Sequence, residues 1–373
     1  MACGLKEGGD LDLCILKAEQ RCAAAATFTT NAFRAAPVLV TMDHLKKDGR
    51  LQAVVVNSGN ANAWTGERGK EDAKTMADLA AREMGILPQD VAVASTGIIG
   101  SYLDMDKAGK GIAEAASRLD VDGGGKAAQA IMTTDTRPKE IAWEHNGFRV
   151  GGMAKGAGMI KPDMATMLAF ITTDAVVEQE TLARALREAV DRTFNRITID
   201  GCTSTNDMVL AMAGGASGIE VGGEEITEAL YQACSVLARS IVEDGEGATK
   251  FIVVRINEAA DGAEAERVAF GIAESALVKT AFFGGDPNWG RVVQALGQAV
   301  KDIDPKKVKV QIGGLTVASA GKPTEVDQGK LEAAVAGREI ELQIFLERGD
   351  VGLEVWACDF SYDYVKINAE YHN

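Results

Sequence analysis

Apolar residues recur along the first 250 positions with two alternating periods, one typical of strands and one typical of helices. The β-branched run LQAVVVNSG at 51–59 ends in turn residues and predicts a strand. The segment 71–85 predicts a helix that stops at Gly85 and buries one face, formed by Ala73, Met76, Ala77 and Ala80. The same reasoning predicts a second strand over 90–100 and helices over 181–194 and 226–244.

The pattern of apolar and polar residues changes after about residue 250. Strand-like alternation is predicted over 251–256, 307–314, 340–349 and 352–360. Only 288–300 and 327–337 show a helical period between them. We therefore predict an α/β (α+β) fold with a larger α/β body over 1–250 and a smaller α+β part over 251–373.

Composition and charge exclude several classes of function. The chain has 373 residues, 46% of them hydrophobic, and a net charge of −15. A strongly acidic chain without a basic tract repels phosphate backbones and anionic lipid, so we expect neither a nucleic-acid partner nor a membrane surface. No leader-like segment opens the chain and no apolar run approaches the length of a membrane span, so we expect a cytoplasmic protein.

The spacing of the histidines and cysteines gives little support to a metal site or to catalysis by histidine. The three histidines form no HExxH pattern, and the six cysteines include no CxxC pair. A zinc site or a Ser–His–Asp triad is therefore disfavoured, and we expect neither a metal nor a cofactor. The free cysteines indicate a reducing compartment.

The remaining polar residues gather in glycine-flanked segments that follow predicted strands. They supply threonine hydroxyls, asparagine amides, one glutamate and backbone N–H groups, which suffice to recognise an amino acid without a metal or a nucleotide. These segments are 57–66, 95–100, 132–139, 155–175, 199–207, 243–250, 282–291 and 367–373.

One threonine, Thr166 in KGAGMIKPDMATMLAFITTDA (155–175), lies where a glycine-bearing loop becomes an apolar strand. A threonine that opens a strand is ordinarily structural. With few histidines available, a threonine hydroxyl can instead be activated by its own α-amino group, which titrates at roughly 7.7–8.0 once the chain is cut before it. Gly156, Gly158 and Pro162 are suited to a strained loop before such a cut, which would fall between Ala165 and Thr166.

The same residues resemble the self-processing junction of the ornithine acetyltransferase (glutamate N-acetyltransferase) family of arginine biosynthesis. The resemblance extends over nearly the whole chain, because several further segments match family motifs in family order: FTTNAFRAAPV, NSGNANAWTG, STGIIG, MTTDTRPK, TSTND, GDPNWGR and YVKINAEY. It implies a layered αββα-type sandwich body that carries the active site, and a C-terminal tail that returns to that site. It also implies cleavage into an α-chain, 1–165, and a β-chain, 166–373, which assemble as a heterotetramer.

The resemblance also assigns roles to residues. Thr166 would take the acetyl group from N-acetylornithine as an ester and pass it to glutamate in a ping-pong reaction. Thr96 and Gly97 match the oxyanion hole. The substrate-binding positions are matched by Thr133 or Thr134, Lys155, Glu246, Asn368 and the C-terminal Asn373. Acetyl-CoA is a possible second donor, and the resemblance leaves open whether this chain uses it.

Three positions depart from the family pattern. Trp64 stands where the family commonly has Cys and is expected to repack a core. Cys202 replaces a frequently acidic residue, which puts a role for that position in doubt. Asn373 replaces the usual Thr or Ser but keeps a polar side chain.

Two other functions fit the same segments. An amidase or aminopeptidase would use the same N-terminal nucleophile with water as the acyl acceptor. A binding protein for small molecules would keep the chain intact at 39.3 kDa. Acetyl transfer to glutamate separates the first alternative from the transferase, and the mass of the purified chain separates the second.

Overall fold

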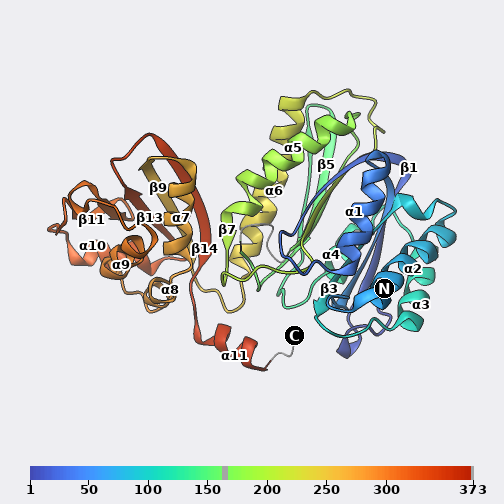
Figure 1. Cartoon of the computed structure of the whole chain (residues 1–373), viewed down its shortest axis with the longest axis horizontal. Coiled ribbons are helices and arrows are strands. Elements are labelled where there is room, and N and C mark those ends of the chain that lie inside the picture. The colour runs from blue at the N-terminus through green and yellow to red at the C-terminus, as the bar shows by residue number, and fades with distance from the viewer. Residues whose placement is uncertain (162–166, 371–373) are drawn as a thin grey trace. The chain divides into compact units, whose positions relative to one another are not determined.

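The computed structural model describes residues 1–161 and 167–370, which form two compact units (Figure 1). The larger unit comprises residues 1–195 and 202–241. The smaller unit comprises residues 196–201 and 242–370. Each unit is built on its own seven-stranded mixed sheet, so the predicted α/β class is confirmed.

The sheet of the larger unit has the order β3-β2-β1-β8-β6-β5-β4. Two neighbouring pairs, β2 with β3 and β6 with β8, are parallel, and the other pairs are antiparallel. The strands are β1 (Leu13–Phe28), β2 (Arg50–Asn60), β3 (Val91–Ile98), β4 (Lys139–His145), β5 (Phe148–Lys155), β6 (Leu168–Thr173) and β8 (Met208–Ala213).

Helices pack on both faces of this sheet because successive strand residues point to opposite sides. Ala53 and Val55 of β2 share a core with α1, α2 and α3, which lie together over the blue strands in Figure 1. Val54 and Val56 face the opposite core, to which α4 contributes. The helices of this unit are α1 (Ala36–Asp48), α2 (Gly66–Met84), α3 (Met105–Ser117), α4 (Gly124–Ala130), α5 (Gln179–Arg192) and most of α6 (Gly223–Glu243).

The sheet of the smaller unit has the order β12-β11-β10-β13-β9-β14-β7. Its strands are β7 (Ile197–Thr198), β9 (Phe251–Ala259), β10 (Lys309–Ile312), β11 (Leu315–Ser319), β12 (Lys322–Pro323), β13 (Glu339–Phe345) and β14 (Val351–Cys358). Its helices are α7 (Gly262–Ala273), α8 (Ala276–Phe283), α9 (Trp289–Ala299), α10 (Gln328–Ala336) and α11 (Tyr362–Glu370).

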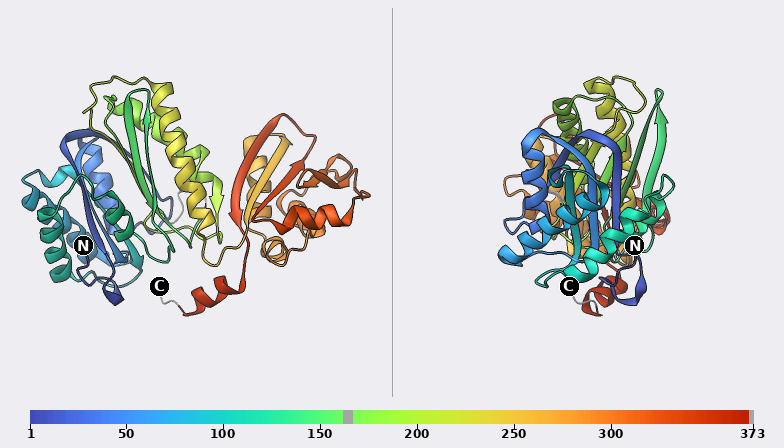
Figure 2. Two further views of the ribbon diagram at one scale, coloured as in Figure 1. Left: turned by 180° about the vertical axis from the view of Figure 1, so that it is seen from behind. Right: turned by 90° about the vertical axis from the view of Figure 1, so that its right-hand side faces the viewer.

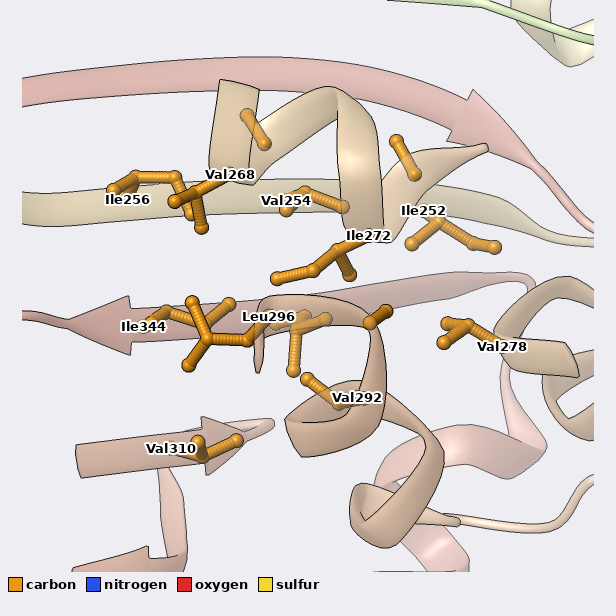
Figure 3. Packing of buried hydrophobic residues seen from close by; sticks show 14 of the residues in the cluster. Ile252, Val254, Ile256, Val268, Ile272, Val278, Val292, Leu296, Val310 and Ile344 are labelled. Carbon is orange, nitrogen blue, oxygen red and sulfur yellow. The ribbon is translucent and has the colours of Figure 1, made fainter. Parts of the chain in front are cut away.

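One apolar core holds the smaller unit together. Figure 3 shows Val254 of β9 and Ile344 of β13 lying against helix residues such as Ile272 and Leu296. Alternate strand residues enter this core, as the alternation of apolar and polar residues along 340–344 predicts.

Most of the predicted elements are confirmed. The predicted apolar face of α2 is buried, and Gly85 ends the helix in the left-handed conformation at φ 67°. The predicted faces of α5 and α6 are buried as well. Figure 2 shows the long α6 from behind.

The prediction that only two helices lie beyond residue 250 is wrong. Helix α7 buries residues on several of its faces, among them Ala265, Val268 and Phe270, so it lacks the one-sided period that reveals an amphipathic helix. Helix α8 is short and carries the fully buried Lys279, whose ammonium donates to the carbonyl oxygen of Cys358. No helix in the described part of the chain combines the length and apolarity needed to cross a membrane.

Replacing Ile344 by Ala should lower the free energy of unfolding of the smaller unit by about 2–5 kcal/mol, because the side chain is fully buried and its removal leaves a cavity. Denaturant unfolding of the two proteins measures the difference. Leu277→Ala in the same unit is the control, since the Leu277 side chain is 52% exposed and its loss should change stability by no more than about 0.5 kcal/mol. Equal effects of the two substitutions would contradict this description of the core.

Candidate active site

The ends of β2 and β3 bring two glycines into close contact. Gly59 pairs with Gly97 in the parallel register. A side chain at Gly97 would place its Cβ 2.3 Å from the carbonyl carbon of Gly59, and Gly97 also has φ 130°. Only glycine satisfies both conditions, so the backbone turn after Thr96 depends on this residue.

Thr96, the other predicted oxyanion residue, is buried beside the predicted substrate lysine. The Nζ atom of Lys155 donates to the Thr96 hydroxyl oxygen at 3.2 Å. Both side chains are almost fully buried, at 4% and 3% exposure. Strand β3 and the last residue of β5 therefore meet at one hydroxyl and one cation.

A buried carboxylate, Asp135, holds the segment before β4 against the end of β5. It pairs with the Lys139 ammonium at 2.6 Å, and neither side chain is exposed. It also accepts hydrogen bonds from the backbone N–H of Thr133, at 2.9 Å, and of Gly156, at 2.7 Å. Thr133 and the residue that follows Lys155 are thus attached to a single side chain.

The charge state of Asp135 follows from these contacts. Burial alone would raise the pKa of this carboxyl, but the ammonium groups of Lys139 and Lys155 and the Gly156 N–H lower it to about 2. Asp135 is therefore ionised at every pH at which the protein is expected to work. The neighbouring Thr134 is half-buried, so both threonines of the pair stay candidates for substrate contact.

Two residues of the TSTND segment belong to this site although sequence reasoning gave them no role. Asn206 donates through Nδ2 to the carbonyl oxygens of Ala61, at 2.7 Å, and Ser95, at 2.8 Å, and so ties the chain after β2 to the strand residue before Thr96. Asp207 is fully buried, and its Oδ1 accepts from the N–H of Met167 at 2.9 Å. Burial raises the pKa of Asp207 well above the usual range of a carboxyl.

The register of the sheet explains why these groups converge. Lys155 of β5 pairs with Leu168 of β6, and Leu168 pairs with Met208 of β8. Lys155, Met167 and Asp207 therefore lie at the same end of three neighbouring strands. The sequence signal was a polar or charged residue at the end of an apolar run, which the chain repeats too often for that signal alone to select the right ones.

The predicted residues Glu246 and Asn368 are joined within the smaller unit. The Nδ2 atom of Asn368, in α11, donates to Glu246 Oε2 at 2.7 Å. Gly247 has φ 67°, and a Cβ there would meet the backbone nitrogen of Tyr364 at 2.5 Å. Close packing of the chain after Glu246 on the start of α11 thus places the two side chains together.

Some predicted residues lie outside the described part of the chain. These are the cleavage residues Ala165 and Thr166 and the C-terminal Asn373. Among the departures from the family pattern, the prediction that Trp64 repacks a core is wrong: its side chain is 71% exposed and contacts Phe33 edge-to-face at a centroid distance of 4.8 Å. Cys202 is exposed as well.

Replacing Asp135 by Asn should destabilise the protein by about 3–5 kcal/mol, because it removes the buried carboxylate that pairs with the Lys139 ammonium. In the wild type the lowered pKa of Asp135 stabilises the fold above the ordinary pKa of 3.8, and this contribution is lost as pH falls from there through about 2. Denaturant unfolding at several pH values measures both effects. The control is Glu114→Gln, which breaks an exposed pair with Arg118 and should cost no more than about 1 kcal/mol. A D135N protein as stable as E114Q would contradict the assignment.

The chain as a whole is similar to known proteins of one family. The model of the ArgJ family matches residues 1–373. The arginine biosynthesis bifunctional protein ArgJ of Symbiobacterium thermophilum is 48% identical over 373 aligned residues, which cover 97% of this chain and 92% of that protein. The protein of the same name from Bacillus subtilis is 43% identical, covering 99% and 93%.

A solved structure is similar as well. The crystal structure of the arginine biosynthesis bifunctional protein ArgJ of Bacillus halodurans is 39% identical and aligns with a TM-score of 0.52, covering 54% of this chain and 98% of that one. The mixed α/β fold, the family model and the relatives agree, and they confirm the resemblance seen in the sequence. The chain belongs to the ArgJ family of arginine-biosynthesis enzymes.

Proposed function

We propose that this chain transfers an acetyl group from N-acetylornithine to glutamate through an ester on Thr166, after cutting itself between Ala165 and Thr166. The observation that carries the proposal is the meeting of four groups at one end of the larger unit's sheet. The Met167 N–H is bonded to Asp207, Asp207 interacts with the Lys155 ammonium, and Lys155 is bonded to the Thr96 hydroxyl. Met167 is the residue covalently attached to the proposed nucleophile.

The position after the proposed cut is firmly anchored. Met167 and Leu168 are each 1% exposed, and β6 continues from them as a buried strand between β5 and β8. A new N-terminus created one residue before Met167 would therefore stay attached to the core. This is the property that an N-terminal nucleophile needs.

The proposed cleavage needs only the chain itself and water. The Thr166 hydroxyl oxygen attacks the carbonyl carbon of Ala165, and the bond between that carbon and the Thr166 nitrogen breaks as the nitrogen takes up the hydroxyl proton. Water then hydrolyses the resulting ester, which leaves a carboxylate on Ala165 and restores the hydroxyl. The released α-amino group becomes the base for catalysis.

Acetyl transfer would repeat this chemistry with substrates. The neutral α-amine takes the hydroxyl proton as Oγ attacks the acetyl carbonyl of N-acetylornithine, and that proton passes to the departing ornithine amine. The amine of glutamate then attacks the ester and regenerates Thr166. The Thr96 hydroxyl and the Gly97 N–H would stabilise the oxyanion formed in each half-reaction.

Two charged groups, one in each unit, are proposed as substrate contacts on the strength of the family resemblance. Lys155 offers a buried cation suited to a carboxylate. Glu246, held by Asn368, offers a carboxylate suited to an ammonium group. Thr133 or Thr134 and Asn373 are proposed as further contacts on the strength of the family resemblance.

The relatives' names support one further part of the proposal. They are described as bifunctional proteins of arginine biosynthesis, which supports acetyl-CoA as a second acetyl donor. We also propose that the two cleaved chains stay together and assemble as a heterotetramer in the cytoplasm. The alternative function is an amidase or aminopeptidase, in which water replaces glutamate as acceptor.

Replacing Thr166 by Ala should abolish both the cut and acetyl transfer, because it removes the only atom that forms the ester. Denaturing mass spectrometry of the wild type should show two fragments that meet between residues 165 and 166, and the variant should stay intact. Thr172→Ala, an exposed position in β6, is the control and should cleave and transfer normally. An active, uncleaved T166A protein would contradict the mechanism, and wild-type release of acetate without transfer to glutamate would favour the amidase.

Replacing Thr96 by Val should lower kcat for acetyl transfer by about 100–1000-fold, the usual effect of losing one oxyanion donor. Steady-state kinetics of the cleaved enzyme measure it. Thr41→Val removes a similarly buried hydroxyl that is bonded to Val93 of the same strand, so it should lower stability without lowering kcat. Equal kcat values for T96V and T41V would exclude Thr96 from the oxyanion hole.

A further inference from the structure

The first residues of the chain are held in place by the buried carboxylate of Asp12. Its two oxygens accept hydrogen bonds at 2.7–3.2 Å from four consecutive backbone N–H groups, those of Cys3, Gly4, Leu5 and Lys6. Hydrogen bonds to a charged acceptor are stronger than those between neutral groups. The backbone of Lys6 therefore has a fixed position in the larger unit.

The side chain of Lys6 lies against the end of β2. The N–H of Ser58 donates to the carbonyl oxygen of Asp12 at 2.8 Å, which attaches the N-terminal segment to this strand. A Cβ at Gly59 would lie 3.0 Å from the Cγ atom of Lys6. In the parallel register Ser58 pairs with Thr96 of β3. The stem of Lys6 is thus placed beside the two strand ends that carry the proposed oxyanion hydroxyl.

The ammonium group of Lys6 lies near that of Lys155. Its Nζ atom donates to the carbonyl oxygen of Leu11 at 2.8 Å. The Leu11 side chain packs against the core cluster that contains Leu168, the residue that pairs with Lys155 across β5 and β6. Residues paired across two strands share a face of the sheet, so Lys155 points to the side on which Leu11 packs. The charge of Lys6 accordingly acts on the charges of Lys155 and Asp135.

Within the described residues, no carboxylate forms an ion pair with Lys6, although its side chain is half-buried. The oxygens of Asp12 are already occupied by the four backbone N–H groups. Burial lowers the pKa of Lys6 and the Lys155 ammonium lowers it further, whereas Asp12 and Asp10 raise it. A half-buried cation beside a second cation favours an anion that comes from outside the chain.

The two proposed amino-acid substrates differ in the charge at the end of their side chains. N-acetylornithine has one carboxylate, and its side chain ends in an ammonium group that two neighbouring cations repel. Glutamate has a second carboxylate, which they attract. A second cation near Lys155 therefore selects for the acceptor rather than for the donor.

We propose that Lys6 is a specificity-determining residue that binds the side-chain carboxylate of glutamate, while Lys155 binds the carboxylate that both substrates share. The inference rests on the proposed function. It makes the N-terminal segment, held by Asp12, a part of the acceptor site. It also gives a reason for keeping a half-buried ammonium group at the end of β2.

Replacing Lys6 by Met tests the assignment, because methionine keeps an unbranched stem against Gly59 and removes the charge. The variant should lower kcat/KM for glutamate by about tenfold or more, the usual effect of losing a hydrogen bond between two charged groups. The values for N-acetylornithine, and for glutamine as a neutral acceptor, should change by less than about twofold. Steady-state kinetics of the cleaved enzyme measure all three, and in a ping-pong reaction each value reports its own half-reaction.

Two further variants separate substrate binding from a loosened N-terminal segment. Lys6→Arg keeps the charge and should retain most of the preference for glutamate over glutamine. Lys107→Met removes another ammonium group that donates to this segment, to the carbonyl oxygen of Gly4 at 2.9 Å, and should leave that preference unchanged. If K6M does not fold, Lys6→Gln replaces it, because its amide can still donate to Leu11.

The possible outcomes distinguish this inference from the proposed function. Equal losses of kcat/KM for glutamate and glutamine in K6M, or the same loss of preference in K107M, would overturn the role of Lys6 and leave the proposed function intact. A wild type that transfers no acetyl group would overturn the proposed function itself. Calorimetric titration of glutamate into wild type and K6M then tests Lys6 without turnover. Binding about tenfold weaker in K6M supports the assignment, and equal binding refutes it.

Discussion

The buried carboxylate of Asp135 is the interaction on which the candidate site most depends. Lys139, four residues along the chain, supplies the counter-charge that makes its burial tolerable. The N–H groups of Thr133 and Gly156 bond to the same carboxylate, so one side chain joins the loop before β4 to the end of β5. Lys155 is fixed directly before that attachment point, where it reaches the Thr96 hydroxyl.

The second constraint is the close approach of β2 and β3 at Gly59 and Gly97. It brings the backbone after Thr96 into a conformation that a residue with a side chain does not adopt without strain. Asn206 then ties the chain after β2 to β3. A rigid frame of this kind suits a reaction in which backbone N–H groups and one hydroxyl stabilise charge, and in which the chain's own amine replaces a histidine base.

The repeated periods of the sequence were enough to predict the fold class and the elements that show a clear period. The apolar face of α2 and its stop at Gly85 could be predicted because local spacing alone determines them. Helix α7 and the long strand β1 were missed, since α7 is buried on several faces and β1 interrupts its apolar run with KAEQR. In the site, Lys155 and Thr96 were predicted from the family resemblance. Asp135, Asn206 and Asp207 were not, because each also bonds to a partner 21 to 145 residues away in the chain, which local spacing does not reveal.

If an acetyl group passes through Thr166, the ester on that residue can be observed. The purified enzyme is mixed with N-acetylornithine without glutamate, quenched in acid and analysed by peptide mass spectrometry. The peptide beginning at Thr166 should gain the mass of one acetyl group and lose it when glutamate is added. Release of ornithine with no acetylated peptide, or acetylation elsewhere in the chain, would contradict it.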